Sequence, residues 1–239
     1  MADPSRLRYR HAVLTDKGNV RKNNEDFFLV DEDLSLFILA DGMGGHAAGE
    51  VASRLACEAV LDSIGRSARQ GRFLSEAARA ALDHANRNVY QASENDRNLM
   101  GMGTTLLFAW ANGSKLRIGH VGDSRLYRFY RGRVECLTRD HEDLETGWLT
   151  SAIGVFGELE QADVLERGVV PGEVFLLCTD GLFSDRRVQR LEDEDIAEIL
   201  ASEEDDLEAA SRFLIERVNE LAGDDNTTVL LFAPQFDEE

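Results

Sequence analysis

The chain reads Leu36-Phe37-Ile38-Leu39-Ala40-Asp41-Gly42-Met43-Gly44-Gly45-His46 over the stretch that decides its fold. Residues 34–40 are apolar apart from Ser35, and so short a run is typical of a buried strand. The glycines after Asp41 allow positive φ and a close approach of the backbone to a bound group. The small residues that follow His46 indicate the start of a helix. One Asp-Gly pair is more often an ordinary strand-to-helix connection, so a functional interpretation needs partners elsewhere in the chain.

The charge of the chain limits its partners. Among 239 residues, 26 Lys and Arg stand against 45 Asp and Glu, which gives a formal net charge of −19 at pH 7. Such a charge argues against nucleic acid and against an anionic membrane surface as the main partner, and it suits a divalent cation. The acidic runs at 192–195 and 203–206 are interpreted as solvated charge at helix N-termini rather than as metal sites.

Cysteine usage and the N-terminal sequence indicate the compartment. Cys57, Cys136 and Cys178 show neither CxxC nor Cys/His ligand spacing, and an odd count gives no disulfide framework, so we expect free thiols. The N-terminus lacks the apolar segment of a signal peptide, and no run approaches the ~18 residues that span a bilayer. We therefore expect a cytoplasmic protein.

Hydrophobic patterning predicts a single α+β domain over 1–239, with short tails at about 1–6 and 234–239 and many antiparallel strands with helix pairs outside them. Helices are expected at 47–63, 74–94, 195–201 and 207–221, where apolar residues recur at three- and four-residue spacing. Strands are expected at 7–14, 27–30, 34–40, 104–111, 116–121, 126–130, 134–137, 162–170, 174–179 and 228–232.

Three further aspartates share the position of Asp41, because each follows an apolar strand and adjoins Gly, Asn or Ser. They are Asp123, Asp180 and Asp225. Each one alone is best explained as a turn former that binds its own backbone. If their strands share one sandwich, however, the carboxylates converge on one edge, where they would repel each other without a cation.

Oxygen ligands without a matching Cys or His set favour Mg²⁺ or Mn²⁺ over zinc. Two such ions ~3.5–4 Å apart hold a hydroxide near neutral pH and direct it at a phosphorus atom. Arg21 offers a fixed fork for phosphoryl oxygens in a chain that is short of positive charge. The alternative is a surface arginine that pairs with Glu25 or Asp26.

Seven motifs occur in an order that resembles metal-dependent protein phosphatases of the phosphatase 2C type, bacterial branch, over nearly the whole chain. They are the segment 15–26, Asp41-Gly-Met-Gly-Gly45, Met102-Gly-Thr-Thr105, Gly122-Asp-Ser-Arg125, Leu137-Thr-Arg-Asp-His141, Thr179-Asp-Gly-Leu182 and Asp225-Asn226. The resemblance implies a four-layer αββα sandwich, in which two antiparallel sheets are flanked by helix pairs and the metal site lies at one edge. It also implies hydrolysis of phosphoserine and phosphothreonine in proteins by a metal-bridged hydroxide.

The resemblance assigns roles to individual residues of this chain. Asp41 corresponds to the carboxylate that bridges two Mg²⁺ or Mn²⁺ ions, with the Gly42 carbonyl on one ion and Asp180 and Asp225 on the other. Asp123, together with Asp180, corresponds to the ligands of a third, weaker ion. Glu25 and Asp26 act through metal-bound water, Arg21 binds the substrate phosphate, and Asp224 receives no ligand role. The catalytic set is therefore Asp41, Arg21, Asp180 and Asp225.

The same resemblance implies partners for the chain. They are phosphorylated proteins and a cognate serine/threonine kinase system that the enzyme opposes, and we expect a monomer. A non-catalytic, metal- or partner-binding member of the same fold is the alternative. A phosphatase acting on the phosphoserine of an anti-sigma-factor antagonist ranks lower, because that branch lacks a counterpart to Arg21.

Two departures from the family pattern concern the mechanism. Many eukaryotic members carry a His after Asp-Gly as the acid for the leaving alkoxide, whereas this chain has Met43. His46, His141 or a metal-bound water are the substitutes, and the acid stays unassigned. Residues 142–148 are too short to form the lid that relatives carry at this place, so we expect a more open substrate face.

Overall fold

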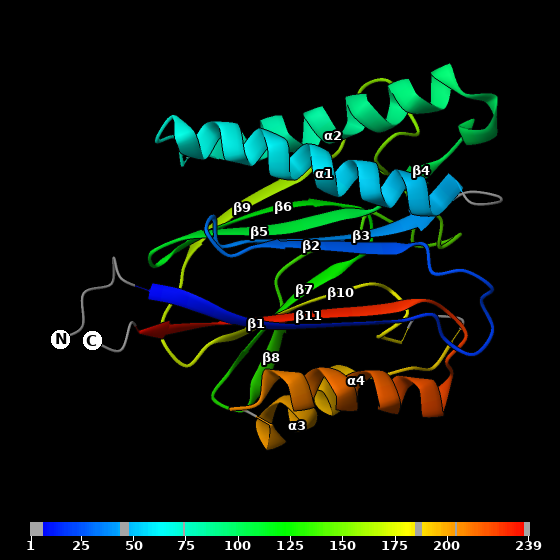
Figure 1. The fold of residues 1–239 in the computed structure, drawn as a ribbon. Helices are drawn as coiled ribbons and strands as arrows, with labels where there is room; N and C mark the ends of the chain where they lie inside the picture. Colours follow the sequence, from blue (N-terminus) through cyan, green and yellow to red (C-terminus); the bar gives the residue numbers. More distant parts are fainter. Residues whose placement is uncertain (1–6, 44–47, 74, 185–187, 204, 237–239) are drawn as a thin grey trace. The chain divides into compact units, whose positions relative to one another are not determined.

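The computed structural model describes residues 7–43, 48–73, 75–184, 188–203 and 205–236 (Figure 1). The chain forms two compact units. The α1–α2 unit comprises Glu25–Ser124 and Asp140–Gly168, and the α3–α4 unit comprises Met1–Asn24, Arg125–Arg139 and Val169–Glu239. The single domain predicted over 1–239 stays a prediction.

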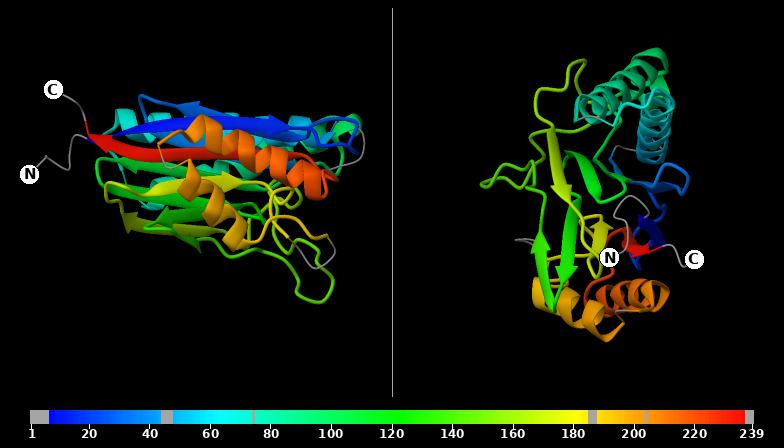
Figure 2. Two further views of the ribbon diagram at one scale, coloured as in Figure 1. Left: turned by 90° about the horizontal axis from the view of Figure 1, so that it is seen from below. Right: turned by 90° about the vertical axis from the view of Figure 1, so that its left-hand side faces the viewer.

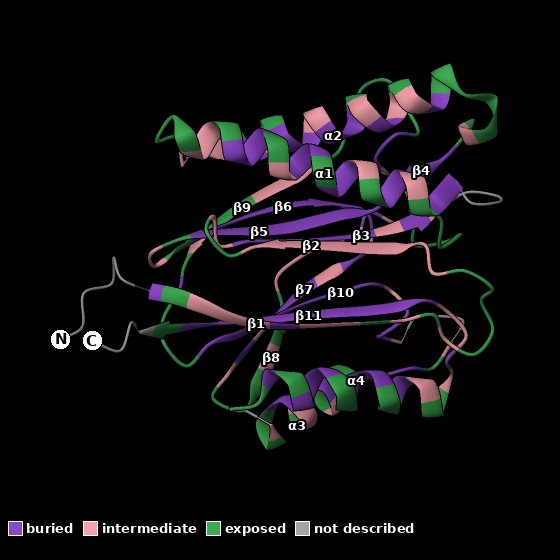
Figure 3. Ribbon diagram, in the orientation of Figure 1, coloured by how far each residue is buried: buried purple, intermediate pink, exposed green. Residues whose placement is uncertain are grey.

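The α1–α2 unit is built on an antiparallel sheet with the strand order β2-β3-β5-β6-β9, and β4 pairs with the end of β3. Its central strands β3, β5 and β6 are almost wholly buried, whereas the edge strand β2 is half-buried along its length (Figure 3). The strands are β2 (Asp26–Asp31), β3 (Leu36–Met43), β4 (Gly103–Thr104), β5 (Leu106–Asn112), β6 (Lys115–Val121) and β9 (Asp163–Gly168).

Helices α1 (Ala48–Arg69) and α2 (Ser75–Asn95) cover one face of this sheet (Figures 1 and 2). Small residues such as Ala52 and Ala56 let α1 lie close to the strand, and they pack in one cluster with alternate residues of β3, including Leu36 and Ile38. The helix runs six residues past the predicted end at 63, because Ile64 is still fully buried against the same cluster. Residues 37, 39, 41 and 43 of β3 therefore face away from the two helices.

The predicted end of the third strand, at residue 40, is wrong. β3 continues to Met43, because β4 pairs with it through Gly42↔Thr104 and Met43↔Gly103. This partner strand comes from a segment about 60 residues further along the chain, which no local pattern around Asp41 reveals. Asp41 consequently lies within a strand rather than on a turn.

The α3–α4 unit contains the other antiparallel sheet, with the strand order β1-β11-β10-β7-β8. Helices α3 (Asp193–Ser202) and α4 (Leu207–Leu221) pack on it, and α4 runs along β1 and β11 (Figure 2). The strands are β1 (Leu7–Asp16), β7 (Arg125–Tyr130), β8 (Arg133–Cys136), β10 (Val174–Cys178) and β11 (Thr227–Phe236).

The acidic run at 192–195 stands at the N-terminus of α3, as predicted, whereas the run at 203–206 begins at the C-cap of α3 and ends at the N-cap of α4. Glu192 begins α3 with a capping box that includes Asp195, and the Asp206 side chain accepts the backbone N–H of Ala209 at the start of α4. Glu204 lies outside the described residues. A carboxylate at these positions satisfies backbone N–H groups and complements the helix dipole, which explains the charge without a metal.

Strand β11 is longer than the predicted 228–232 and pairs with β1 as far as Leu7↔Phe236, so residues 234–236 of the predicted tail belong to the sheet. Pro234 is tolerated there because β10 pairs only with Val229 to Phe232, so no N–H is needed toward that side. Among the described residues, no helix is long and apolar enough to cross a membrane.

Candidate active site

Two predicted carboxylates face each other across strands of the α1–α2 unit. Asp26 and Asp41 are direct partners in the antiparallel pairing of β2 with β3, and both are half-buried. Opposed residues of such a pair share a face with Cβ atoms about 4.5–5.5 Å apart, and like charges at that separation repel. A bound cation removes the repulsion, and hard oxygen donors fit Mg²⁺ or Mn²⁺.

Two threonines hold the backbone of Asp41. Its N–H donates to the Thr105 hydroxyl at 2.9 Å, and its carbonyl accepts from the Thr104 hydroxyl at 2.8 Å and from the Thr105 N–H at 2.9 Å. Both threonine side chains are buried. The sequence alone assigns no role to the motif at 102–105. In the structure, its threonines fix the backbone position of Asp41 and thereby the position from which the carboxylate extends.

Thr105 also connects Asp41 with the turn that carries Asp123. Its hydroxyl lies 2.8 Å from the hydroxyl of Ser124, which is fully buried. Gly122 precedes Asp123 with φ +105, and a Cβ there would lie 2.7 Å from the Thr105 side chain, so only glycine fits. The structure thus brings Asp26, Asp41 and Asp123 to one end of this sheet.

Gly42 occupies a position where no side chain fits. A Cβ there would lie 2.2 Å from the carbonyl oxygen of Gly49, at the start of α1. The Gly42 N–H donates to the Glu25 carbonyl at 3.1 Å, and the Ser53 hydroxyl donates to the same carbonyl at 2.7 Å. The strand end, the helix start and the residue before β2 therefore contact each other directly through their backbones.

The remaining predicted ligands lie in the α3–α4 unit. Asp180 follows β10 and Asp225 precedes β11, and these antiparallel neighbours pair through Cys178↔Val229, so both aspartates stand at the same end of the sheet. A Cβ on Gly181 would lie 2.0 Å from the Asn226 carbonyl, so the two connections touch. The predicted set is thus divided between the two units.

Arg21 forms an ion pair with Asp225, at 2.6 Å between Nη2 and Oδ2. The Arg21 side chain is 51% exposed, so solvent screens this pair and its guanidinium remains accessible. Asn226 fixes the loop that carries Arg21, because its side-chain amide donates to the carbonyls of Lys17 and Asn23 at 3.0 and 2.9 Å. The sequence motif contains Asn226, but only the structure shows this role.

Arg190 is a positioning residue that sequence reasoning missed. Its guanidinium is 4% exposed and binds both carboxylate oxygens of Asp224 at 3.1 and 3.0 Å. It also donates to the Asp180 carbonyl at 3.2 Å. Asp224 thus orients Arg190, which holds the backbone of Asp180, and no local pattern around Arg190 could have revealed this arrangement.

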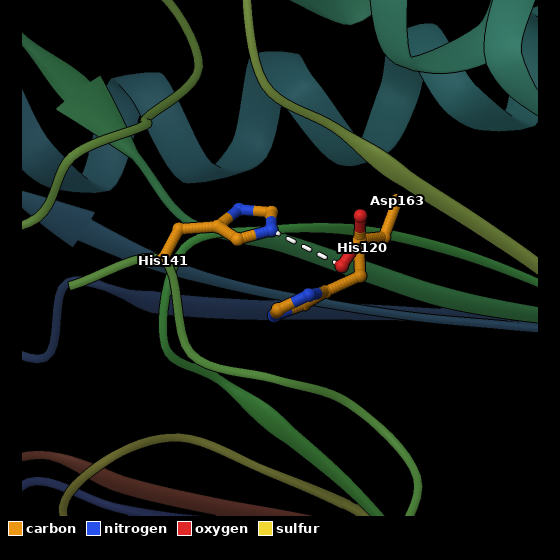
Figure 4. A group of neighbouring side chains, drawn as sticks. All are labelled: His120, His141 and Asp163. Atoms are coloured by element: carbon orange, nitrogen blue, oxygen red, sulfur yellow. Dashed lines mark hydrogen bonds and ion pairs between the residues drawn. The ribbon is translucent and has the colours of Figure 1, made fainter.

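His120, His141 and Asp163 form a cluster in the α1–α2 unit (Figure 4). Their candidate ligand atoms lie within 4.8 Å of one another. The Gly122 N–H donates to Nδ1 of His141 at 3.2 Å, so the proton of the neutral ring is on Nε2, which donates to Asp163 at 3.2 Å. Both ring nitrogens of His141 are thus used in hydrogen bonds, so we assign His141 to hydrogen bonding rather than to cation binding.

Burial dominates the chemistry of His120. It lowers the pKa of this imidazole to about 4, and the neighbouring His141 acts in the same direction, while Asp163 and Asp140 act against it. His120 is therefore neutral at physiological pH. His141 is also buried, with both ring nitrogens engaged, which favours a structural role over that of general acid. His46, the other histidine considered for the acid, lies outside the described residues.

Residues 142–148 form a short hairpin that closes on itself. Glu142 bridges to Leu149, and the Asp143 N–H donates to the Trp148 carbonyl at 2.8 Å. The Asp143 carboxylate accepts the N–H groups of Glu145 and Thr146 at 3.0 and 2.8 Å. The segment satisfies its own backbone, and the more open substrate face stays a prediction.

The chain belongs to the protein phosphatase 2C family, whose model, described as protein phosphatase 2C, matches residues 19–228. It is 33% identical to a serine/threonine phosphatase, stp, of Listeria monocytogenes, over 91% of this chain and 92% of that protein. It is also similar to the crystal structure of the Mycobacterium tuberculosis serine/threonine phosphatase PstP, with a TM-score of 0.83 and 32% identity over 95% of this chain and 99% of that one. A structure of the PstP catalytic domain with two manganese ions gives a TM-score of 0.82 and 34% identity over the same shares.

These comparisons confirm the resemblance and the predicted fold class. Two antiparallel sheets, each with its own helix pair, are what the sequence predicted for an α+β chain of this family. The roles of Asp41, Gly42, Asp123, Asp180, Asp225, Glu25, Asp26 and Arg21 are not tested by them and remain proposals.

Proposed function

We propose that this chain is a metal-dependent protein serine/threonine phosphatase that hydrolyses phosphoserine and phosphothreonine in proteins. One observation carries the proposal: the Asp41 carboxylate stands opposite Asp26 on a backbone that Thr104 and Thr105 hold at both ends. The family match over residues 19–228 and the similarity to stp and PstP support the same activity.

Divalent cations are the cofactors that these carboxylates fit. We assign Asp41 and the Gly42 carbonyl to them in the α1–α2 unit, with Asp26 and Glu25 acting through water, and Asp180 and Asp225 in the α3–α4 unit. Asp123 is assigned to a third, weaker ion. When bound, Mg²⁺ or Mn²⁺ supplies positive charge for the phosphoryl oxygens and lowers the pKa of a coordinated water. The two manganese ions in the PstP catalytic domain support this assignment.

Arg21 is assigned to the substrate phosphate. Its side chain is half exposed although it pairs with Asp225, and an accessible guanidinium can form charge-assisted hydrogen bonds with a phosphoryl group. The hydrogen bonds from Asn226 to both ends of the Arg21 loop order this loop before phosphate binds. Less conformational entropy is therefore lost on binding.

The proposed substrates are phosphorylated proteins. The proposed setting, which the family resemblance implies, is a monomeric enzyme that opposes a cognate serine/threonine kinase system. A cytoplasmic location is supported by the three cysteines, which are free thiols in the structure, because a reducing compartment keeps thiols in that state.

The test compares hydrolysis of an aryl phosphate and of matched phosphoserine, phosphothreonine and phosphotyrosine peptides, with Mn²⁺, with Mg²⁺ and with EDTA. We expect metal-dependent turnover of the aryl phosphate and of the first two peptides, and loss of turnover in Asp41→Asn. Asp33→Asn, in an exposed turn before β3, is the matched control and should keep wild-type rates. Turnover that survives both EDTA and Asp41→Asn would sink the proposal. Metal binding that raises the melting temperature without any turnover would favour the non-catalytic alternative.

A further inference from the structure

An apolar groove of about 390 Å³ opens at the end of β3 in the α1–α2 unit. Its apolar walls include Met43, Trp148, Val155 and Phe156. The last three side chains are exposed, with 75% of Trp148 and 68% of Phe156 accessible to solvent. Large apolar side chains that gather at one exposed place mark an interaction site more often than isolated ones do.

The groove is held in shape by the backbone. Ile153 pairs with Thr104 through two hydrogen bonds of 3.1 and 2.9 Å, which attaches the segment carrying Val155 and Phe156 to β4. The Asn86 side chain of α2 donates to the Phe156 carbonyl at 2.9 Å and accepts the Gly154 N–H at 2.8 Å. A preformed groove binds a side chain without first having to become ordered.

The position of Met43 connects the groove to the proposed chemistry. Asp41 and Met43 stand two residues apart on β3, so their side chains share the face that α1 and α2 leave uncovered. Two residues of a strand span about 7 Å. An extended peptide whose phosphate is bound at a cation held by Asp41 would therefore place a side chain within about three positions of the phosphorylated residue at the groove.

The chain segment that supplies most of the groove is acidic. Between residues 140 and 160 the chain has six acidic residues and neither lysine nor arginine. Glu145 and Glu158 are exposed and lie close in sequence to Trp148 and Phe156. A ligand that adds basic side chains to an apolar one complements this edge, whereas an acidic ligand is repelled.

We propose that the groove binds an apolar side chain of the phosphoprotein substrate, within about three positions of the phosphorylated residue, when lysine or arginine flanks it. The inference rests on the proposed function and adds a substrate class to it. The phosphate site binds the phosphoryl group, and the groove binds a side chain near the phosphorylated residue in the sequence. Specificity among phosphoproteins then comes from Met43, Trp148 and Phe156.

The test uses four phosphothreonine peptides that differ at two places. Two positions from the phosphothreonine the peptides carry Leu or Ser, and beyond it they carry Arg or Glu. We expect wild-type kcat/KM with Mn²⁺ to be about tenfold or more higher for the Leu-Arg peptide than for the Ser-Glu peptide, mainly through KM, because a buried leucine contributes that much to binding. Trp148→Ala and Phe156→Ala should each reduce this ratio to about threefold or less. Glu145→Gln with Glu158→Gln should reduce the preference for Arg alone.

The matched control is Phe213→Ala, which removes an exposed phenylalanine from α4 and should retain the wild-type ratio. Binding is measured separately through fluorescence, because Trp148 is exposed while Trp110, the other tryptophan, is buried. The unphosphorylated Leu-Arg peptide should shift the emission to shorter wavelength, and Trp148→Phe should lose the shift.

Equal kcat/KM for all four peptides in the wild-type enzyme, or an unchanged ratio in both groove variants, would overturn the inference. Failure of the proposed function has a different signature: the wild-type enzyme would not hydrolyse the aryl phosphate at all. Because every comparison is a ratio of two peptides within one variant, a general loss of activity does not imitate a loss of specificity.

Discussion

His141 and Gly122 hold each other through two hydrogen bonds. The backbone N–H of His141 donates to the Gly122 carbonyl at 2.8 Å, and the Gly122 N–H donates to Nδ1 of the His141 ring at 3.2 Å. Asp163 fixes the ring from its other side, through Nε2. Gly122 has positive φ and directly precedes Asp123, so this pair sets the course of the turn that presents a proposed metal ligand.

Replacing His141 removes the acceptor of a buried N–H. We expect His141→Ala to lower the free energy of unfolding by about 2–4 kcal/mol, from the unsatisfied Gly122 N–H and the space left by the ring. Urea denaturation measures this change. His84→Ala, on the partly exposed surface of α2, should change stability by less than about 0.5 kcal/mol. Equal small losses in both variants would contradict a positioning role for His141.

The hydroxyl of Thr105 is the second supporting group, because it accepts the Asp41 N–H and contacts Ser124. Thr105→Val keeps the shape but leaves these partners unpaired, and we expect it to destabilise the protein by about 1–3 kcal/mol and to raise the metal concentration for half-maximal activity. Thr105→Ser retains the hydroxyl, so its stability and its metal concentration for half-maximal activity should stay close to those of the wild type. Metal titrations and urea unfolding of the two variants check this. A Val variant that matches the Ser variant would show that the hydroxyl is dispensable.

Local patterns predicted the elements well where local contacts decide them. Helix α4 was expected at 207–221 and occupies Leu207–Leu221, because its apolar spacing and its acidic first turn are properties of the segment itself. β3 was predicted to end three residues too early, at residue 40, since its last pairs are supplied by β4 from far along the chain. Sequence patterns carry little information on such long-range pairing.

The candidate site divides in the same way. Asp41, Asp180 and Asp225 were each predicted to follow a strand. Asp180 does follow β10, whereas Asp225 lies between helix α4 and strand β11, so its predicted place after a strand is wrong. The side chains that hold Asp41 and Asp180 in place were not predicted, because Thr105 and Arg190 reach these partners only through the tertiary fold. Side chains that bind backbone groups of distant segments leave no periodic pattern and no characteristic spacing in the sequence.

Arg21 should matter for substrate binding and little for stability. Its ion pair with Asp225 is half exposed, so Arg21→Ala should change the free energy of unfolding by less than about 1 kcal/mol. We expect the same variant to lower kcat/KM by about 10–100-fold, mainly through KM, since a charge-assisted pair with phosphate is lost. Arg21→Lys keeps the positive charge but lacks the planar guanidinium that binds phosphate through two hydrogen bonds. Its kcat/KM should therefore lie between those of the wild type and Arg21→Ala. Steady-state kinetics measure these changes. Lys22→Ala, at the exposed neighbouring residue, is the control and should keep wild-type kinetics. An unchanged KM in Arg21→Ala would contradict the assignment of Arg21 to the phosphate site.

Burial of neutral His120 makes stability depend on pH in a defined window. Its folded pKa of about 4 lies below the ordinary value of 6.5, mainly because burial disfavours the imidazolium, so between these values the unfolded chain binds the proton that the folded protein excludes. The free energy of unfolding should therefore be highest above about pH 6.5 and fall as the pH drops toward 4, by roughly 3 kcal/mol from this group. Other groups titrate in the same range, so the measurement is the difference between wild type and His120→Asn in urea unfolding at pH 7.5, 6.0 and 5.0. The wild type should lose more stability on acidification than the variant, and parallel curves would show that His120 does not exclude its proton in the folded state.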